Sequence, residues 1–297
     1  MKIRLFIFIT AVLLLPAAGL FLSGAEWADL EARALGGDDA IINPPSTLLT
    51  TLMMFGYIIF VNHLNKLVTG NRPFKDQLPY LKRVGAAGAI LCWLLAYLNL
   101  FVASWTTQPG NPLLQALLYT PLFALLAPAV LCTRAFISAL PNVLKSMSSR
   151  HTFTPPTADK LAYTLIPLSA LGLIGGAVWP TRLDLLLWTA PLLLLVTLQL
   201  LWHESTIFSG LKSGDYGRAI CSALAGSIAG NFAIFAYHSN GGMLTLNSGF
   251  VRQFGMVLFG LACMQLADVI AENWRGKKRD EIFPKKKFPI PVVVKNK

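Results

Sequence analysis

The feature that most constrains this chain is a series of eight apolar runs, each close to the length that a helix needs to cross a lipid bilayer. Polar connections, several with Pro and Gly, separate the runs. We predict transmembrane helices over Leu5–Leu22, Thr47–Leu64, Val84–Ser104, Leu113–Leu131, Leu161–Trp179, Leu185–Trp202, Ala219–Tyr237 and Phe250–Ala271. The expected fold is therefore all-α, a polytopic transmembrane helix bundle of about eight helices.

The composition excludes a soluble domain. Only 13% of the residues are charged and 55% are hydrophobic, whereas about 25% of residues are charged in soluble proteins. Too little charge remains to cover a water-soluble particle of this size, so the lipid bilayer is the expected surroundings of the chain.

The cations are sorted along the sequence. Lys and Arg fall in alternate connections and in the C-terminal tail, and only Arg33, Arg182 and Arg252 fall on the other side. The positive-inside rule then places both termini in the cytoplasm of a bacterial-type cell, with the chain in its inner membrane. The net charge of +11 does not indicate a nucleic-acid partner, because no aromatic-plus-basic binding module accompanies it.

The first apolar run allows two interpretations. Lys2 and Arg4 precede it, and Ser23-Gly24-Ala25 resembles the small-residue site at which a signal peptide is cleaved. The run is also nearly long enough to remain as an uncleaved first helix, which we favour. Both interpretations place the acidic segment that follows outside the cell.

The longest interior connection, residues 138–160, divides the chain into two predicted halves. Residues 1–137 would form a first four-helix half and residues 161–274 a second, with residues 275–297 as a basic cytoplasmic tail. The segments His63–Gly70 and His203–Gly210 resemble each other, which suggests parallel repeats. Chance similarity between apolar sequences is the alternative.

The basic tail is expected to contact anionic lipid. It contains Lys277-Lys278-Arg279 and Lys285-Lys286-Lys287, and each cation near an anionic membrane surface contributes about 1 kcal/mol. The tail also suits a soluble docking partner, for which the sequence gives no specific support.

Three polar residues, Ser227, Asn231 and His238, share one face of the seventh predicted helix. They could form hydrogen bonds between helices, helped by the close approach that Gly226-x-x-x-Gly230 allows. They could instead line a polar pathway through the membrane.

The eighth predicted helix ends with Gln265, Asp268 and Glu272 on one face. An unpaired carboxylate at the depth of Asp268 would cost a few kcal/mol, so we expect a cationic partner, with Arg134 or Lys66 as the candidates. A structural ion pair and a proton or cation site are both compatible with this pattern.

A metal or haem site is a further hypothesis. His63 and His203 are expected near the cytoplasmic interface, where they could ligate haem iron or join Glu204 and Asp268 around a metal. The alternative is that each imidazole simply reaches water. The sequence identifies no cofactor, and four cysteines inside apolar runs indicate neither a disulfide framework nor a zinc site.

These features predict a transporter or permease for an unidentified small solute or ion. Prolines inside predicted helices can break them around a binding site; they are Pro121, Pro128, Pro167 and Pro191. Substrate would pass near Asn231, with Asp268 and Glu272 at the inner gate. One alternative is a membrane-embedded enzyme or redox subunit that acts at the cytoplasmic face. Another is a non-catalytic subunit or assembly factor with partners in a larger membrane complex.

Overall fold

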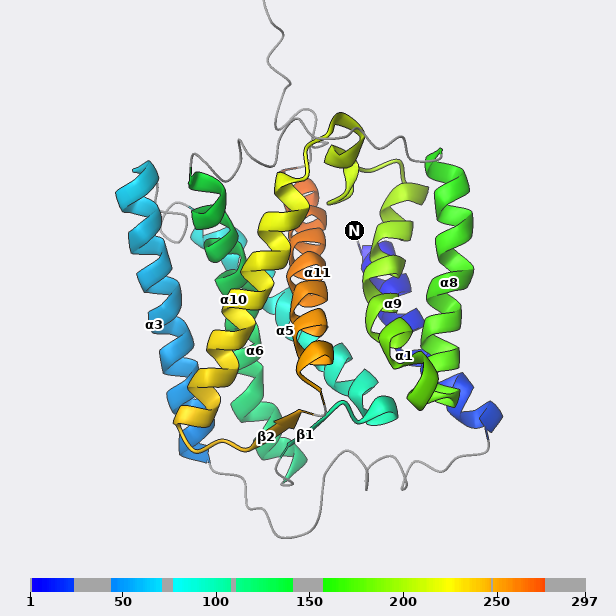
Figure 1. The fold of residues 1–297 in the computed structure, drawn as a ribbon, viewed down its shortest axis with the longest axis horizontal. Helices are drawn as coiled ribbons and strands as arrows, with labels where there is room; N and C mark the ends of the chain where they lie inside the picture. The colour runs from blue at the N-terminus through cyan, green and yellow to red at the C-terminus, as the bar shows by residue number, and fades with distance from the viewer. Residues whose placement is uncertain are drawn as a thin grey trace, which may run out of the picture.

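The computed structural model describes residues 2–23, 44–70, 77–107, 111–140, 157–246 and 248–275. This part of the chain contains eight long helices (Figure 1). They are α1 (Lys2–Ser23), α3 (Pro44–Thr69), α5 (Leu78–Val102), α6 (Pro112–Ala139), α8 (Ala158–Val178), α9 (Pro180–Leu201), α10 (Gly217–Ser239) and α11 (Gly249–Arg275). All eight are long and apolar enough to cross a membrane. The predicted all-α transmembrane bundle is confirmed, and the chain is a multi-pass membrane protein.

Several helices extend beyond the apolar runs that predicted them. Helix α6, for example, begins at Pro112, where the side chain of Asn111 accepts a hydrogen bond of 2.9 Å from the backbone N–H of Leu113. Capping by Asn with Pro in the first turn is a favourable helix start. The same helix continues past Arg134 to Ala139.

The internal prolines do not interrupt their helices. Pro121 and Pro128 lie inside α6, Pro167 inside α8 and Pro191 inside α9. In α9 the backbone departs from helical geometry at Leu183, far from Pro191. Prolines are tolerated in membrane helices where neighbouring groups satisfy the freed carbonyls.

The bundle has two sides and a centre (Figure 1). Helices α3, α6 and α10 pack together on one side, and α1, α8 and α9 pack together on the other. Helices α5 and α11 lie between these groups and contact each other. Each predicted half thus contributes helices to both sides. The division into halves stays a prediction, because most of the 138–160 connection lies outside the described residues.

The two ends of the bundle differ. At one end, called the ribbon end below, β1 (Trp105–Thr107) pairs antiparallel with β2 (Leu244–Leu246), and Trp105 lies opposite Leu246. At the other, called the η1 end, the short 3-10 helix η1 (Ser209–Ser213) follows α9. Figure 1 places the start of α1 and the end of α11 in the half toward the η1 end.

The sorting of cations follows these two ends. Arg182 and Arg252 are the described cations at the ribbon end, since they lie where α9 and α11 begin. The remaining described Lys and Arg lie in the half toward the η1 end: Lys2, Arg4, Lys66, Lys82, Arg83, Arg134, Lys160, Lys212, Arg218 and Arg275.

Helices α10 and α11 cross at two glycines. A Cβ atom added to Gly226 would lie 2.6 Å from the Cα atom of Gly260, and one added to Gly260 would lie 2.7 Å from the Cα atom of Gly226. The two backbones therefore touch, as small residues permit in membrane helix pairs. This crossing fixes how the polar residues of the two helices meet.

Candidate functional site

A large cavity opens between the helices toward the ribbon end. It has a volume of about 620 Å³ and is lined by residues of α5, α6, α9, α10 and α11, together with Trp105 of β1 and Leu244 of β2. Its wall is mainly apolar and rich in aromatic rings, among them Trp93, Tyr97, Trp105, Tyr119, Phe123, Trp188, Tyr237 and Phe259. Ligand pockets typically have volumes of about 300–1,000 Å³ and mostly apolar walls.

Hydrogen bonds and ring contacts hold this aromatic wall in place. The rings of Trp105 and Trp188 stack with centroids 4.9 Å apart, and the indole N–H of Trp188 donates a 3.0 Å hydrogen bond to Ser104 Oγ. Across the cavity, the hydroxyls of Tyr119 and Tyr237 lie 2.9 Å apart. Residues with fixed rotamers of this kind give a largely pre-formed pocket.

Asn99 secures the connection between α5 and β1, part of which lines the cavity. Its Nδ2 donates to the backbone oxygen of Trp105 at 2.8 Å, and its Oδ1 accepts from the backbone N–H of Trp105 at 3.2 Å. Ala103, the residue that ends α5, adopts a left-handed φ of 44°. The Asn99 side chain is therefore committed to the backbone turn that positions Trp105.

Arg252 carries the only charge among the described residues that line this cavity. It lies in the first turn of α11. Its Nε atom is buried and has no hydrogen-bond partner within the described residues. A guanidinium donates hydrogen bonds through five N–H groups and accepts none. Because Arg252 lines the cavity, its terminal N–H groups are suited to an anionic or carbonyl group there.

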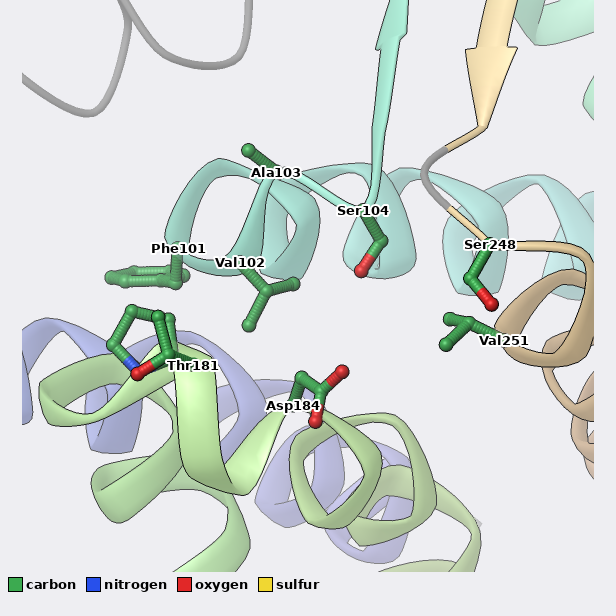
Figure 2. A pocket seen from close by; sticks show the side chains of 9 residues that line it. Phe101, Val102, Ala103, Ser104, Thr181, Asp184, Ser248 and Val251 are labelled. Atoms are coloured by element: carbon green, nitrogen blue, oxygen red, sulfur yellow. The ribbon is translucent and has the colours of Figure 1, made fainter.

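A smaller pocket adjoins the cavity (Figure 2). It has a volume of about 310 Å³ and shares Ser104, Ser248 and Val251 with the larger one. Asp184 of α9 lies across this pocket from Ser104, Ser248 and Val251 (Figure 2). The carboxylate is the only charged group among the described residues that line the smaller pocket.

One residue of the polar face predicted on the seventh helix, Asn231, forms hydrogen bonds with α11. Asn231 Nδ2 donates to Gln253 Oε1 and Gln253 Nε2 donates to Asn231 Oδ1, both at 3.0 Å, which ties α10 to α11. Asn231 also donates to the backbone oxygen of Ser227 at 2.8 Å. His238 is exposed in the last turn of α10. Neither cavity described above is lined by Ser227, Asn231 or His238.

Toward the η1 end, the eighth-helix residues form a second polar group. Asp268 forms an ion pair with Arg218, the second residue of α10. From the sequence, Arg134 or Lys66 was expected as this partner; Arg218 was missed because it was assigned to the connection before the seventh helix. The Gly226–Gly260 crossing brings the two helices close enough for the pair. Arg134 also interacts electrostatically with Asp268.

Gln265 anchors the segment that carries η1. Its Nε2 donates to Gln199 Oε1 of α9, and its Oε1 accepts from the backbone N–H of Ile207 at 2.8 Å. Glu272 lies one turn beyond Asp268 in α11, and its side chain is outside the described part of the structure. Gln265 and Asp268 thus lie at the opposite end from Arg252 and line neither cavity.

The candidate metal or haem ligands are spread over the bundle. His63 and His203 are exposed and Glu204 is half-buried. Helix α3, which carries His63, and the end of α9, which precedes His203, lie on opposite sides of the bundle (Figure 1). Among the described residues, no group of three or more His, Cys, Asp or Glu is placed to hold a metal ion. Haem or metal ligation stays a prediction without geometric support.

Sequence reasoning did not single out Arg252 or Asp184 as site residues. A usable sign was present, because Arg252 is one of the few cations that fall on the wrong side of the positive-inside pattern. An ionisable residue that breaks this sorting is a functional candidate. Asp184 had no comparable sign, since it lies in a short polar connection where a carboxylate is ordinary.

Comparison with known proteins finds no family model, no curated protein and no solved structure that matches this chain.

Proposed function

We propose that this membrane protein is a transporter or permease that takes up an amphipathic anion through the cavity at its ribbon end. The observation that carries the proposal is a mainly apolar cavity of about 620 Å³ whose one described charged lining residue, Arg252, forms no ion pair within the described residues. The chemistry of the wall suits a ligand with an apolar body and one negative group.

Arg252 is the residue that would select the anion. A hydrogen bond to a charged group contributes about 1.5–3 kcal/mol, which corresponds to roughly tenfold to a hundredfold in affinity. An Arg guanidinium also presents two parallel donors that fit a carboxylate or phosphate. A neutral ligand of the same shape would lack the negative charge that pairs with this guanidinium.

The aromatic wall would hold the apolar body. Trp105 and Trp188 present a stacked pair of indoles on one side, and Tyr119 and Tyr237 present linked rings on the other. Such rings contribute apolar area and favour stacked or edge-on contacts with another aromatic group. A ligand with a fused aromatic body is therefore a suitable probe.

Transport additionally requires the other end to open. There the bundle is held by the Arg218–Asp268 ion pair and by the bond from Ile207 to Gln265. We propose that these contacts form the inner gate. Asp268 would take part in it directly, and Glu272 would follow one turn farther along α11. Under the positive-inside rule the ribbon end faces outward, and an alternating-access cycle would release these contacts when the cavity closes outside.

Binding can be tested with two matched probes. N-acetyl-naphthylalanine is an anion, and N-acetyl-naphthylalaninamide is its neutral counterpart. Isothermal titration of the full chain in lipid nanodiscs should give an affinity for the anion about tenfold or more above that for the amide. Arg252→Gln should abolish this difference, because the guanidinium that would pair with the carboxylate is lost.

Arg182→Gln is the control variant, since Arg182 is an exposed cation at the same end that lines neither cavity. It should leave the preference intact. The proposed site would be contradicted if the wild-type protein bound both probes equally. It would also be contradicted if Arg252→Gln and Arg182→Gln lost the preference for the anion to the same extent. Saturable uptake of the anion into proteoliposomes, lost in Arg252→Gln, distinguishes a transporter from a binding protein.

A further inference from the structure

We infer that the substrate is a zwitterion with an apolar body, whose ammonium group is held by Asp184 while its anionic group is held by Arg252. The inference rests on the proposed function, because it adds a second charge to the ligand of the same cavity. The chemical class is that of an apolar amino acid or a short apolar peptide.

The first argument is the continuity of the two pockets. The cavity that contains Arg252 and the smaller pocket that contains Asp184 share Ser104, Ser248 and Val251. Val251 and Arg252 are neighbours in the first turn of α11, so the two pockets meet beside that turn. A single small molecule can therefore occupy the apolar cavity and reach into the smaller pocket.

The second argument is the state of the two charges. Within the described residues, Asp184 and Arg252 form no ion pair with each other or with another side chain. Asp184 and Arg252 do not neutralise each other. Each can therefore pair with one of the two charges of a zwitterionic ligand. Each such contact to a charged group is among the stronger hydrogen bonds in proteins.

The third argument is the position of the Asp184 side chain. Helix α9 is kinked at Leu183, where the backbone leaves helical geometry with φ −118° and ψ 17°, and Asp184 is the first residue after the kink. A carboxylate there suits the dipole of the helical segment that follows. The same carboxylate lies across the smaller pocket from Ser104 and Ser248 (Figure 2).

The hydroxyls around Asp184 complete a site for an ammonium group. Thr181, Ser104 and Ser248 line the same pocket. A hydroxyl oxygen accepts hydrogen bonds, and an ammonium donates three. Ser104 Oγ already accepts from Trp188 and has a second lone pair available. The Asp184 carboxylate and these hydroxyl oxygens together thus match the three donors of a protonated amine.

Two ligands that differ by one ammonium group test the inference. Glycyl-naphthylalanine is N-acetyl-naphthylalanine with an amine on the acetyl methyl, and this α-amine is mostly protonated at pH 6.5, because its ordinary pKa is about 7.7–8.0. In nanodiscs the wild-type chain should bind the glycyl compound about tenfold more tightly than the acetyl compound. Asp184→Asn should remove this gain, so that the two compounds bind the variant with about equal affinity.

Asp159→Asn is the matched control, because Asp159 is an exposed carboxylate in the first turn of α8 and lines neither pocket. The Asp159→Asn variant should still bind the glycyl compound about tenfold more tightly than the acetyl compound. If the acetyl compound binds through Arg252 but the glycyl compound binds no better, the zwitterion inference is overturned and the proposed anion site stands. If neither compound binds, both fall. The wild-type ratio decides the matter even where a variant does not fold.

Discussion

The carboxylate of Asp268 on α11 is paired with the guanidinium of Arg218 on α10, and both side chains are almost buried, with 10% of Arg218 and 11% of Asp268 exposed. Removing one partner leaves a buried charge without compensation, which costs about 3–5 kcal/mol. We therefore expect Asp268→Asn and Arg218→Gln each to lower the free energy of unfolding by about that amount. Chemical denaturation of the purified protein in mixed micelles measures it.

The double variant separates an ion pair from a loss of shape. Asp268→Asn combined with Arg218→Gln removes both charges, so it should cost less than the sum of the single changes. Additive losses would mean that the two side chains do not interact. Arg134 also interacts electrostatically with Asp268. The double variant removes this interaction too, so it should recover only part of the lost free energy of unfolding.

The crossing of α10 and α11 predicts opposite effects for two glycines of one helix. Gly260→Ala places a Cβ against the backbone of α10, and overpacking of this kind costs about 1–3 kcal/mol. Gly255→Ala meets nothing within 4 Å and should stabilise α11 by about 0.5–1 kcal/mol, because Ala is the better helix former. Thermal unfolding of both variants tests this. Equal shifts would show that the helices do not touch at Gly260.

Asn231 offers a test between packing and a pathway. If its role is the paired amide contact with Gln253, Asn231→Ala and Gln253→Ala should each destabilise the protein by about 1 kcal/mol, and the double variant by little more. Binding of N-acetyl-naphthylalanine should stay within about twofold of the wild-type value. A large loss of binding with unchanged stability would instead support the pathway role.

The orientation of the bundle predicts a labelling pattern. The four cysteines at positions 92, 132, 221 and 263 are buried, so they give little background. Met243 is 63% exposed near the ribbon end, and Ser213 is exposed at the η1 end. A membrane-impermeant maleimide added to intact cells should label Met243→Cys and not Ser213→Cys, because in the proposed orientation the cation-rich side faces the cytoplasm. Inverted vesicles should show the reverse, and labelling of Ser213→Cys in intact cells would contradict the orientation.

The sequence predicted the helices well because each is an apolar run long enough to cross a bilayer. The pattern of hydrophobic residues sets where a membrane helix lies, and its ends extend as far as capping allows, as Asn111 shows for α6. The ribbon was not predicted. Its strands, which place Trp105 opposite Leu246, are too short for an alternating pattern to stand out.

The site was less predictable, because it depends on which helices become neighbours. Arg252 and Asp184 are far apart in sequence, and only the packing of α9 against α11 and α5 gives them a continuous space. Periodicity did place Gln265 and Asp268 on one face. It could not identify their partners Gln199 and Arg218, since partners on other helices follow from tertiary packing.

Gln265 gives a last prediction, on the segment that carries η1. Gln265→Leu removes the acceptor of the Ile207 backbone N–H, and an orphaned buried donor costs about 1–3 kcal/mol. The amides of Ile207 and of Ser209–Ser213 should then exchange with deuterium roughly 5- to 150-fold faster. Gln253→Leu is the control, because it changes the same residue type at the other end of α11 and should leave these amides protected. Unchanged exchange in Gln265→Leu would show that the bond does not hold this segment, and the proposed gate would lose one of its two contacts.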